Sequence, residues 1–252
     1  MNYEDDLISR IRALSRPLEP VATGIAPRLR RIDGVKAVLF DVYGTLLVSA
    51  ADSEHNGPLG DRIRQEHARL KAAGVAFPEV EIRDIWKAVK PDLKHADDVE
   101  RWAVEYECNA HPTWPMPGAA DTLSTLEARG IATGVVSNAQ FYSPLAIQAL
   151  MGRPLPEPAV WSFELGEAKP SPRLFRIALD DLAGRGIRPG EVLCIGNDMA
   201  KDILPAAALG CRTALFAGDQ RSYRPGTWQA PVVPPDAVLT DLRQITTDLL
   251  TE

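Results

Sequence analysis

The chain has 252 residues, a net charge of −6, and hydrophobic and charged fractions of 45% and 25%. These values are typical of a soluble globular protein with a sizeable core. The positive residues are scattered among acidic ones, so no basic stripe indicates binding to nucleic acid. No segment approaches membrane-spanning length, and the N-terminus lacks the apolar stretch of a signal peptide. The three cysteines have no CxxC spacing, so we expect reduced thiols in a cytoplasmic protein.

The first 34 residues are predicted to form a helix and an extended arm. Leu7, Ile8, Ile11 and Leu14 recur at helical spacing, which indicates an amphipathic helix. We expect its apolar face to dock on the chain's own core rather than on a partner. A homodimer through this helix, or through the cap described below, stays open.

Short apolar runs then alternate with helical patterns. The runs span residues 35–40, 131–137, 159–163, 191–196 and 211–216, and helices are expected over 118–129, 171–182 and 203–209. This alternation predicts an α/β fold, in which a doubly wound parallel sheet is covered by helices on both faces in three layers.

A long insert separates the first strand from the second. Residues 51–115 contain no strand-like run, but they carry three apolar stripes at helical spacing. We therefore predict a helical cap over 51–115 and a core made of 35–50 and 116–252. Trp86, Trp102 and Tyr106 lie on these stripes and are expected to pack inside the cap.

Polar residues follow the predicted strands at the point where each strand ends. In a doubly wound sheet these ends meet at one edge, where ligands bind. The edge residues are Asp41, Tyr43 and Thr45 after the first strand, Ser137 and Asn138 after the second, Lys169 after the third, and Asn197, Asp198 and Asp202 after the fourth.

This set of side chains suits phosphoryl transfer to a carboxylate. Asp41 can attack phosphorus, Thr45 and Ser137 can bind its non-bridging oxygens, and Lys169 can offset their charge. Asp198 together with Asp41 can hold a hard cation that neutralises the incoming phosphate.

The motifs "FDVYGTL", "VVSN", "AKPSPRLF" and "IGNDMAKDI" resemble, in this order, the four signature motifs of the haloacid dehalogenase-like (HAD) hydrolase superfamily. The insert after the first motif and its return through "PMPG" resemble the subfamily with a helical cap. The resemblance covers about residues 35–216, and each motif falls at a strand end. It implies a Rossmann-like core with an inserted cap, a small-molecule substrate and Mg²⁺ as cofactor.

The resemblance also implies a role for several residues. Asp41 would be the covalent nucleophile, and the main-chain carbonyl of Tyr43 would be a magnesium ligand. Ser137 and Lys169 would hold the transferred group, with Gly44 and Asn138 beside them in the substrate site. Asp198 would complete the metal site, directly or through water.

The fourth motif departs from the family pattern, in which an acid follows the glycine directly. Here Gly196 is followed by Asn197 and only then by Asp198, so the residue that faces the metal stays open. Asp202 has three open roles: a metal ligand, a partner of Lys169, or the cap of the helix expected from Ile203.

Tyr43 is the second departure, because family phosphatases usually carry a second Asp there as proton donor. A phenol with a pKa of about 10 is poorly matched to proton exchange near neutral pH. The haloacid dehalogenases proper carry a tyrosine at this place, since a halide leaves without a proton. Whether the Tyr43 side chain takes part in the chemistry therefore stays open.

We expect a magnesium-dependent phosphatase of a small phosphorylated metabolite that forms an aspartyl phosphate on Asp41. One alternative is 2-haloacid dehalogenation through an aspartyl ester, with an arginine from the cap; the candidates Arg62, Arg64 and Arg69 also suit a solvated helix face. A second alternative is a binding or regulatory protein of low turnover. The chain's other notable groups are interpreted as surface or packing residues, namely His55, His67, His95, His111 and Cys194.

Overall fold

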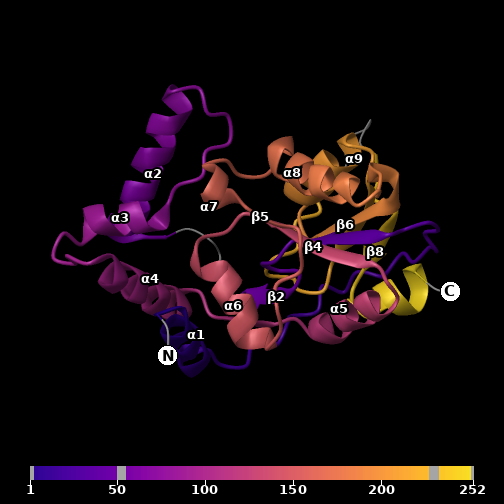
Figure 1. The fold of residues 1–252 in the computed structure, drawn as a ribbon, viewed down its shortest axis with the longest axis horizontal. Helices are drawn as coiled ribbons and strands as arrows, with labels where there is room; N and C mark the ends of the chain where they lie inside the picture. The colour runs from indigo at the N-terminus through magenta and orange to yellow at the C-terminus, as the bar shows by residue number, and fades with distance from the viewer. Residues whose placement is uncertain (1–2, 50–54, 227–232, 251–252) are drawn as a thin grey trace.

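The computed structural model describes residues 3–49, 55–226 and 233–250 of the chain (Figure 1). Six parallel strands form the central sheet in the order β5-β4-β1-β6-β7-β8. Their bounds are β1 Ala37–Phe40, β4 Ala132–Ser137, β5 Ala159–Trp161, β6 Val192–Gly196, β7 Arg212–Phe216 and β8 Ala237–Leu239. The strand order reverses at β1, so the doubly wound α/β fold expected from the sequence is confirmed.

The two faces of the sheet belong to different parts of the core, because alternate strand residues point to opposite sides. Val38 and Phe40 of β1 pack in the larger core cluster with α5 (Ala119–Ala128) and α6 (Tyr142–Met151). Ala37 and Leu39 pack in the second cluster with α8 (Pro172–Gly184) and α9 (Leu204–Ala208). The sheet is therefore the middle of three layers (Figure 1).

The helical cap stands to one side of the sheet (Figure 1). It contains α2 (Gly57–Ala72), α3 (Ile82–Val89) and α4 (Ala96–Ala110). Trp86 is buried, as expected, and makes edge contacts with Trp102 at 6.0 Å and Tyr106 at 4.9 Å between ring centroids. Trp102 is 36% exposed, so the expectation that it packs inside the cap is wrong. The boundary predicted between residues 50 and 51 lies outside the described residues, and the domain limits stay a prediction.

Three short strands were not predicted from the sequence: β2, β3 and the edge strand β8 of the central sheet. β2 (Leu47–Ser49) pairs antiparallel with β3 (Thr113–Pro115), so the expectation of no strand within 51–115 is wrong at its last residues. β8 adds a strand from the C-terminal tail. Runs of three residues carry too little periodicity to be recognised.

The N-terminal helix docks on the chain itself, as expected. α1 (Tyr3–Leu14) packs against both α4 and α6, and Leu7 and Ile11 are 2% exposed within the main core cluster. Four short helices complete the fold: α7 Ser162–Leu165, η1 Pro189–Glu191, the π-helical turn η2 Met199–Ile203, and η3 Ile245–Leu249. None of the helices in the described ranges combines the length and apolar character needed to cross a membrane.

Candidate active site

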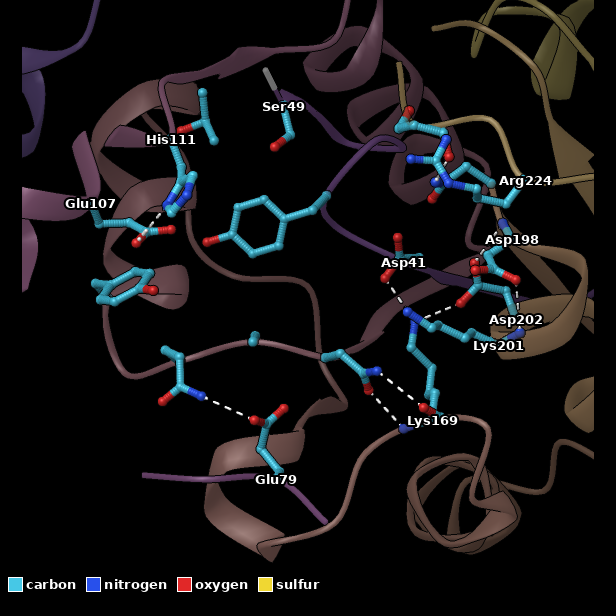
Figure 2. A pocket seen from close by; sticks show the side chains of 18 of the residues that line it. Asp41, Ser49, Glu79, Glu107, His111, Lys169, Asp198, Lys201, Asp202 and Arg224 are labelled. Atoms are coloured by element: carbon cyan, nitrogen blue, oxygen red, sulfur yellow. Dashed lines mark hydrogen bonds and ion pairs between the residues drawn. The ribbon is translucent and has the colours of Figure 1, made fainter. Parts of the chain in front are cut away.

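A cavity of about 360 Å³ lies between the cap and the carboxyl ends of β1, β4 and β6. Figure 2 shows Asp41, Lys169, Asp198 and Asp202 along one side of it. Six of the predicted site residues line the cavity, namely Asp41, Tyr43, Asn138, Lys169, Asp198 and Asp202. Gly44, Thr45 and Ser137 are buried and, as far as the structure describes the cavity, do not line it.

Lys169 links two carboxylates from different strands. Its Nζ donates hydrogen bonds to Asp41 Oδ1 at 2.7 Å and to Asp202 Oδ1 at 2.6 Å, and all three side chains are at most 10% exposed. Burial opposes the charge on Lys169, but Asp202 and Asp41 outweigh it and raise the pKa of the ammonium group above its usual value. Lys169 therefore stays protonated, and its hydrogen bond orients the Asp41 side chain.

The β4 end holds both partners of this pair in place. Ser137 Oγ donates to Asp41 Oδ1 at 3.1 Å. Asn138 clamps the backbone of Lys169, since its Oδ1 accepts from the Lys169 N–H at 2.7 Å and its Nδ2 donates to the Lys169 carbonyl at 3.1 Å. The hydrogen bonds to the Asp41 side chain that come from described residues end on Oδ1, so Oδ2 is the oxygen left for attack on a substrate.

The fourth motif divides its two acids between different tasks. Asp198 Oδ1 accepts from the backbone N–H groups of Ala200 and Lys201 and caps the π-helical turn η2. Asp202 Oδ2 accepts from the Asp198 N–H at 3.0 Å, while Oδ1 holds Lys169. Of the three roles left open for Asp202, the structure shows the contact with Lys169, and the cap belongs to Asp198 instead.

Asn197, which replaces the usual acid of the motif, lines the cavity with both polar atoms of its side chain engaged. Its Oδ1 accepts from Thr45 Oγ1 at 3.2 Å, and its Nδ2 donates to the Ser222 carbonyl at 2.6 Å. Thr45 is fully buried, so its hydroxyl ties the first motif to the fourth. At Gly44, where φ is +83°, a Cβ would lie 2.4 Å from Cβ of Ser222, so the turn requires glycine there.

Tyr43 points its phenol toward α6. Its Oη lies 2.8 Å from Ser143 Oγ. Burial, and then the negative charge of Glu107, raise the pKa of this phenol above its usual value. Because its pKa is raised, the Tyr43 phenol stays neutral and does not exchange its proton near neutral pH.

The oxygen groups at the Asp41 edge fit a hard cation. The backbone hydrogen bonds of the turn after β1 end on the carbonyls of Val42 and Leu47, which leaves the Tyr43 carbonyl for a ligand. Asp198 keeps its Oδ2 without a hydrogen bond from a described residue, so it can offer that oxygen to a cation beside the Asp41 oxygen left for attack. Carbonyl and carboxylate oxygens are what Mg²⁺ prefers. Asp202 fits less well, because both of its oxygens are engaged.

The cap and the tail bring residues to the cavity that the sequence analysis missed. Glu79 precedes α3 and accepts from Ser162 Oγ at 2.7 Å and from Gln140 Nε2 at 3.2 Å. Ser222 and Arg224 reach the cavity from the tail after β7. No motif marked these positions, since they meet Asp41 only through the packing of distant segments.

The far side of the cavity carries a cluster from the cap. His55, Glu107 and His111 each offer a ligand atom within 4.8 Å of the others. Figure 2 shows Glu107 and His111 across the cavity from Asp41 and Lys169. The interpretation as surface or packing groups suits the exposed His95. His55 and His111 also pack, against each other and Tyr106, but in addition they line the cavity. The signal was the spacing of Glu107 and His111, four residues apart on one helix face.

The arginines considered for a halide or carboxylate site do not reach this place. Arg62, Arg64 and Arg69 are exposed on α2, and Arg64 and Arg69 pair with Asp61 and Glu66 on the same helix. None of the three is among the described residues that line the cavity. They belong to a solvated helix face, which removes one support for dehalogenation.

Residues 35–210 match the family model described as haloacid dehalogenase-like hydrolase. The chain belongs to this family and is a hydrolase. It is 28% identical over 197 residues, 72% of this chain and 84% of the relative, to (S)-2-haloacid dehalogenase 1 of Pseudomonas sp. (strain CBS-3). It is 26% identical over 230 residues, 85% of this chain and 91% of the relative, to phosphoglycolate phosphatase of Xylella fastidiosa (strain Temecula1).

Solved structures share the fold. A HAD phosphatase from Thermococcus onnurineus has a TM-score of 0.51 at 20% identity, covering 84% of this chain and 96% of that one. An L-2-haloacid dehalogenase from Xanthobacter autotrophicus has a TM-score of 0.52 at 20% identity, with the same coverage. Both reaction types therefore occur on this fold, and the choice between them depends on the site.

Proposed function

We propose that the protein is a magnesium-dependent phosphatase of a small phosphorylated metabolite, with Asp41 as the nucleophile. The observation that carries this proposal is the buried contact of Lys169 with Asp41 and Asp202, next to the oxygen groups of Tyr43 and Asp198. A phosphate brings negative charge to a carboxylate, so the reaction needs cations at this edge. Phosphatases of phosphoglycolate and phosphoserine are among the relatives.

In this proposal Asp41 Oδ2 attacks phosphorus and forms an aspartyl phosphate. The P–O bond to the leaving group breaks, and the departing oxyanion takes its proton from water. Lys169 and Ser137 fix Oδ1 and thereby aim the free oxygen. The Tyr43 carbonyl and Asp198 would hold Mg²⁺ beside the attacking oxygen of Asp41, and the ion when bound would neutralise charge on the transferred group. Water then attacks the aspartyl phosphate, and Asp41 is released with inorganic phosphate.

The neutral phenol of Tyr43 predicts which substrates react fastest. An alkyl alcohol needs a proton as it leaves, and Tyr43 is a poor source of one. Acyl and aryl phosphates, whose leaving groups need little protonation, should therefore turn over faster than alkyl phosphates of similar size. Equal rate constants for acetyl phosphate and for a simple alkyl phosphate would contradict this expectation.

The test measures hydrolysis of p-nitrophenyl phosphate with and without Mg²⁺, in wild type and Asp41→Asn. We expect release that requires Mg²⁺ and that Asp41→Asn abolishes. Asp121→Asn is the matched control, because Asp121 is exposed on α5, away from the cavity. Its rate should equal that of the wild type.

A different result would redirect the assignment. If no phosphate ester is hydrolysed, but chloride is released from 2-chloropropionate in the presence of a chelator, Asp41 attacks carbon and the phosphatase proposal fails. The proposal also includes a cytoplasmic location and no nucleic-acid or membrane partner. Whether the protein is a monomer or a homodimer stays open.

A further inference from the structure

We infer that His55, Glu107 and His111 form a second metal site, which takes a borderline transition-metal ion of the Zn²⁺ class. The three residues come from two cap segments and line the same cavity as Asp41, and Figure 2 shows Glu107 and His111 on its far side. Two imidazole nitrogens and one carboxylate oxygen make a ligand set suited to Zn²⁺ rather than to Mg²⁺. This inference does not depend on the reaction that Asp41 performs.

Glu107 and His111 already have nearly the spacing that such an ion needs. Glu107 and His111 stand one turn apart at the end of α4, and His111 Nδ1 lies 3.1 Å from Glu107 Oε2. Ligand bonds of about 2.0–2.1 Å in a tetrahedron place neighbouring ligand atoms roughly 3.3–3.4 Å apart. The two atoms are therefore already separated by nearly the distance that a bound ion requires.

His55 is held close to the pair by the backbone. A Cβ at Gly60 would lie 1.6 Å from the His55 carbonyl oxygen, so only glycine lets the start of α2 approach so closely. The His55 ring contacts the His111 ring at a centroid distance of 4.6 Å. The tight packing of the His55 backbone against the start of α2 thus fixes the position of this residue.

The chemistry of His55 suits a ligand. Its Nδ1 is buried and has no hydrogen-bond partner among the described residues. An imidazole nitrogen without such a partner can offer its lone pair to a metal ion. Glu107 supplies the negative charge that offsets part of the ion's charge. An unpartnered buried nitrogen beside a carboxylate is costly without a ligand and is satisfied by one.

Three protein ligands leave at least one position of a four-coordinate ion open. In structural zinc sites all positions are filled by protein, whereas an open position is typical of sites that bind water or a substrate. Because the cluster and Asp41 line one cavity, the open position belongs to the substrate chamber. The site is therefore distinct from the oxygen site at the Asp41 edge in both ligand chemistry and place.

The test titrates Zn²⁺ into full-length protein without a polyhistidine tag, after chelator treatment, and measures stoichiometry and affinity by calorimetry. We expect one Zn²⁺ per chain that His55→Ala, His111→Ala and Glu107→Gln each weaken at least about tenfold. Co²⁺ gives a second readout, because its visible absorption reports a four-coordinate site that the same variants should lose. Glu107→Gln is nearly isosteric, so its fold should be kept, as circular dichroism will show.

Matched controls separate this site from other ligands. His95→Ala removes an exposed histidine next to the same helix, Cys108→Ser removes the thiol beside Glu107, and Asp41→Asn weakens the opposite edge. All three should keep the Zn²⁺ affinity of the wild type within about twofold. Unchanged affinity in Glu107→Gln and His111→Ala would overturn the inference, and so would a loss of binding in Asp41→Asn or Cys108→Ser.

Discussion

The phenol oxygen of Tyr43 lies 2.8 Å from the hydroxyl oxygen of Ser143 on α6. This contact directs the side chain of the first motif toward a helix of the core and fixes the turn that carries Asp41. The backbone of Tyr43 and its side chain thus have separate tasks. The carbonyl is the group that we propose as a metal ligand, while the phenol anchors the turn.

Tyr43→Phe should therefore leave catalysis largely intact. Removal of one hydrogen bond is expected to lower the free energy of unfolding by about 1 kcal/mol, and kcat for aryl phosphates should change less than about threefold. Steady-state kinetics and urea unfolding measure the two effects, with Tyr106→Phe in the cap as control. A fall of kcat by two orders of magnitude would show instead that the phenol acts in the chemical step.

Lys169→Met should remove both activity and stability. Two carboxylates would remain buried without their counter-charge, a situation that costs about 3–5 kcal/mol, and kcat should fall by at least roughly 10²–10³-fold because Asp41 is no longer oriented. Lys87→Met is the matched control, since Lys87 is exposed and pairs only on the surface of α3. Retained activity in Lys169→Met would exclude the assigned role.

Much of this arrangement was predictable from the sequence, because parallel strands place their carboxyl ends along one edge. Asp41, Asn138, Lys169 and Asp198 come from four different segments, yet their position after apolar runs was enough to expect them together. The role of Asp202 was not predictable. An acid at this position of the fourth motif can either cap the following helix or contact Lys169, and the sequence is the same in both cases. Only the burial of Asp202 and its two engaged oxygens separate these roles.

The cap side of the site could not be predicted in the same way. His55 and Glu79 reach the cavity through the packing of cap helices, and no periodic pattern encodes the angle between such helices. The spacing of Glu107 and His111 was visible, but i,i+4 pairs of this kind are also common on solvated helices. The third member, His55, lies more than fifty residues earlier, so the cluster exists only in the folded chain.

Gly196→Ala tests how tightly the fourth motif is packed. A Cβ at Gly196 would lie 2.3 Å from Cγ of Asp202, so Asp202 and then Lys169 must move. We expect a loss of about 1–3 kcal/mol from overpacking, together with a fall in kcat. In contrast, Gly184→Ala adds a methyl group with nothing within 4 Å at the end of α8 and should be neutral or slightly stabilising. Equal thermal stability and kcat in the two variants would refute this account.

The raised pKa of the Glu79 carboxyl group makes the free energy of unfolding depend on pH. Burial raises the pKa of its carboxyl group above the unfolded value, although hydrogen bonds from Ser162 and Val80 favour the ionised form. Because the folded pKa is the higher one, the contribution of Glu79 is fully present below the unfolded value of about 4.3 and is lost as pH rises through the folded pKa. Glu79→Gln removes this titration.

We therefore expect Glu79→Gln to gain stability relative to wild type as pH rises from about 4.5 to about 8. Urea unfolding at several pH values gives the difference in free energy between the two proteins. Glu4→Gln serves as control for the exchange of a carboxyl for an amide group, because Glu4 is exposed on α1, and the Glu79→Gln difference is compared with it at each pH. A gain that shrinks with rising pH would mean that the ionised carboxylate of Glu79 is stabilised by its donors more than burial penalises it.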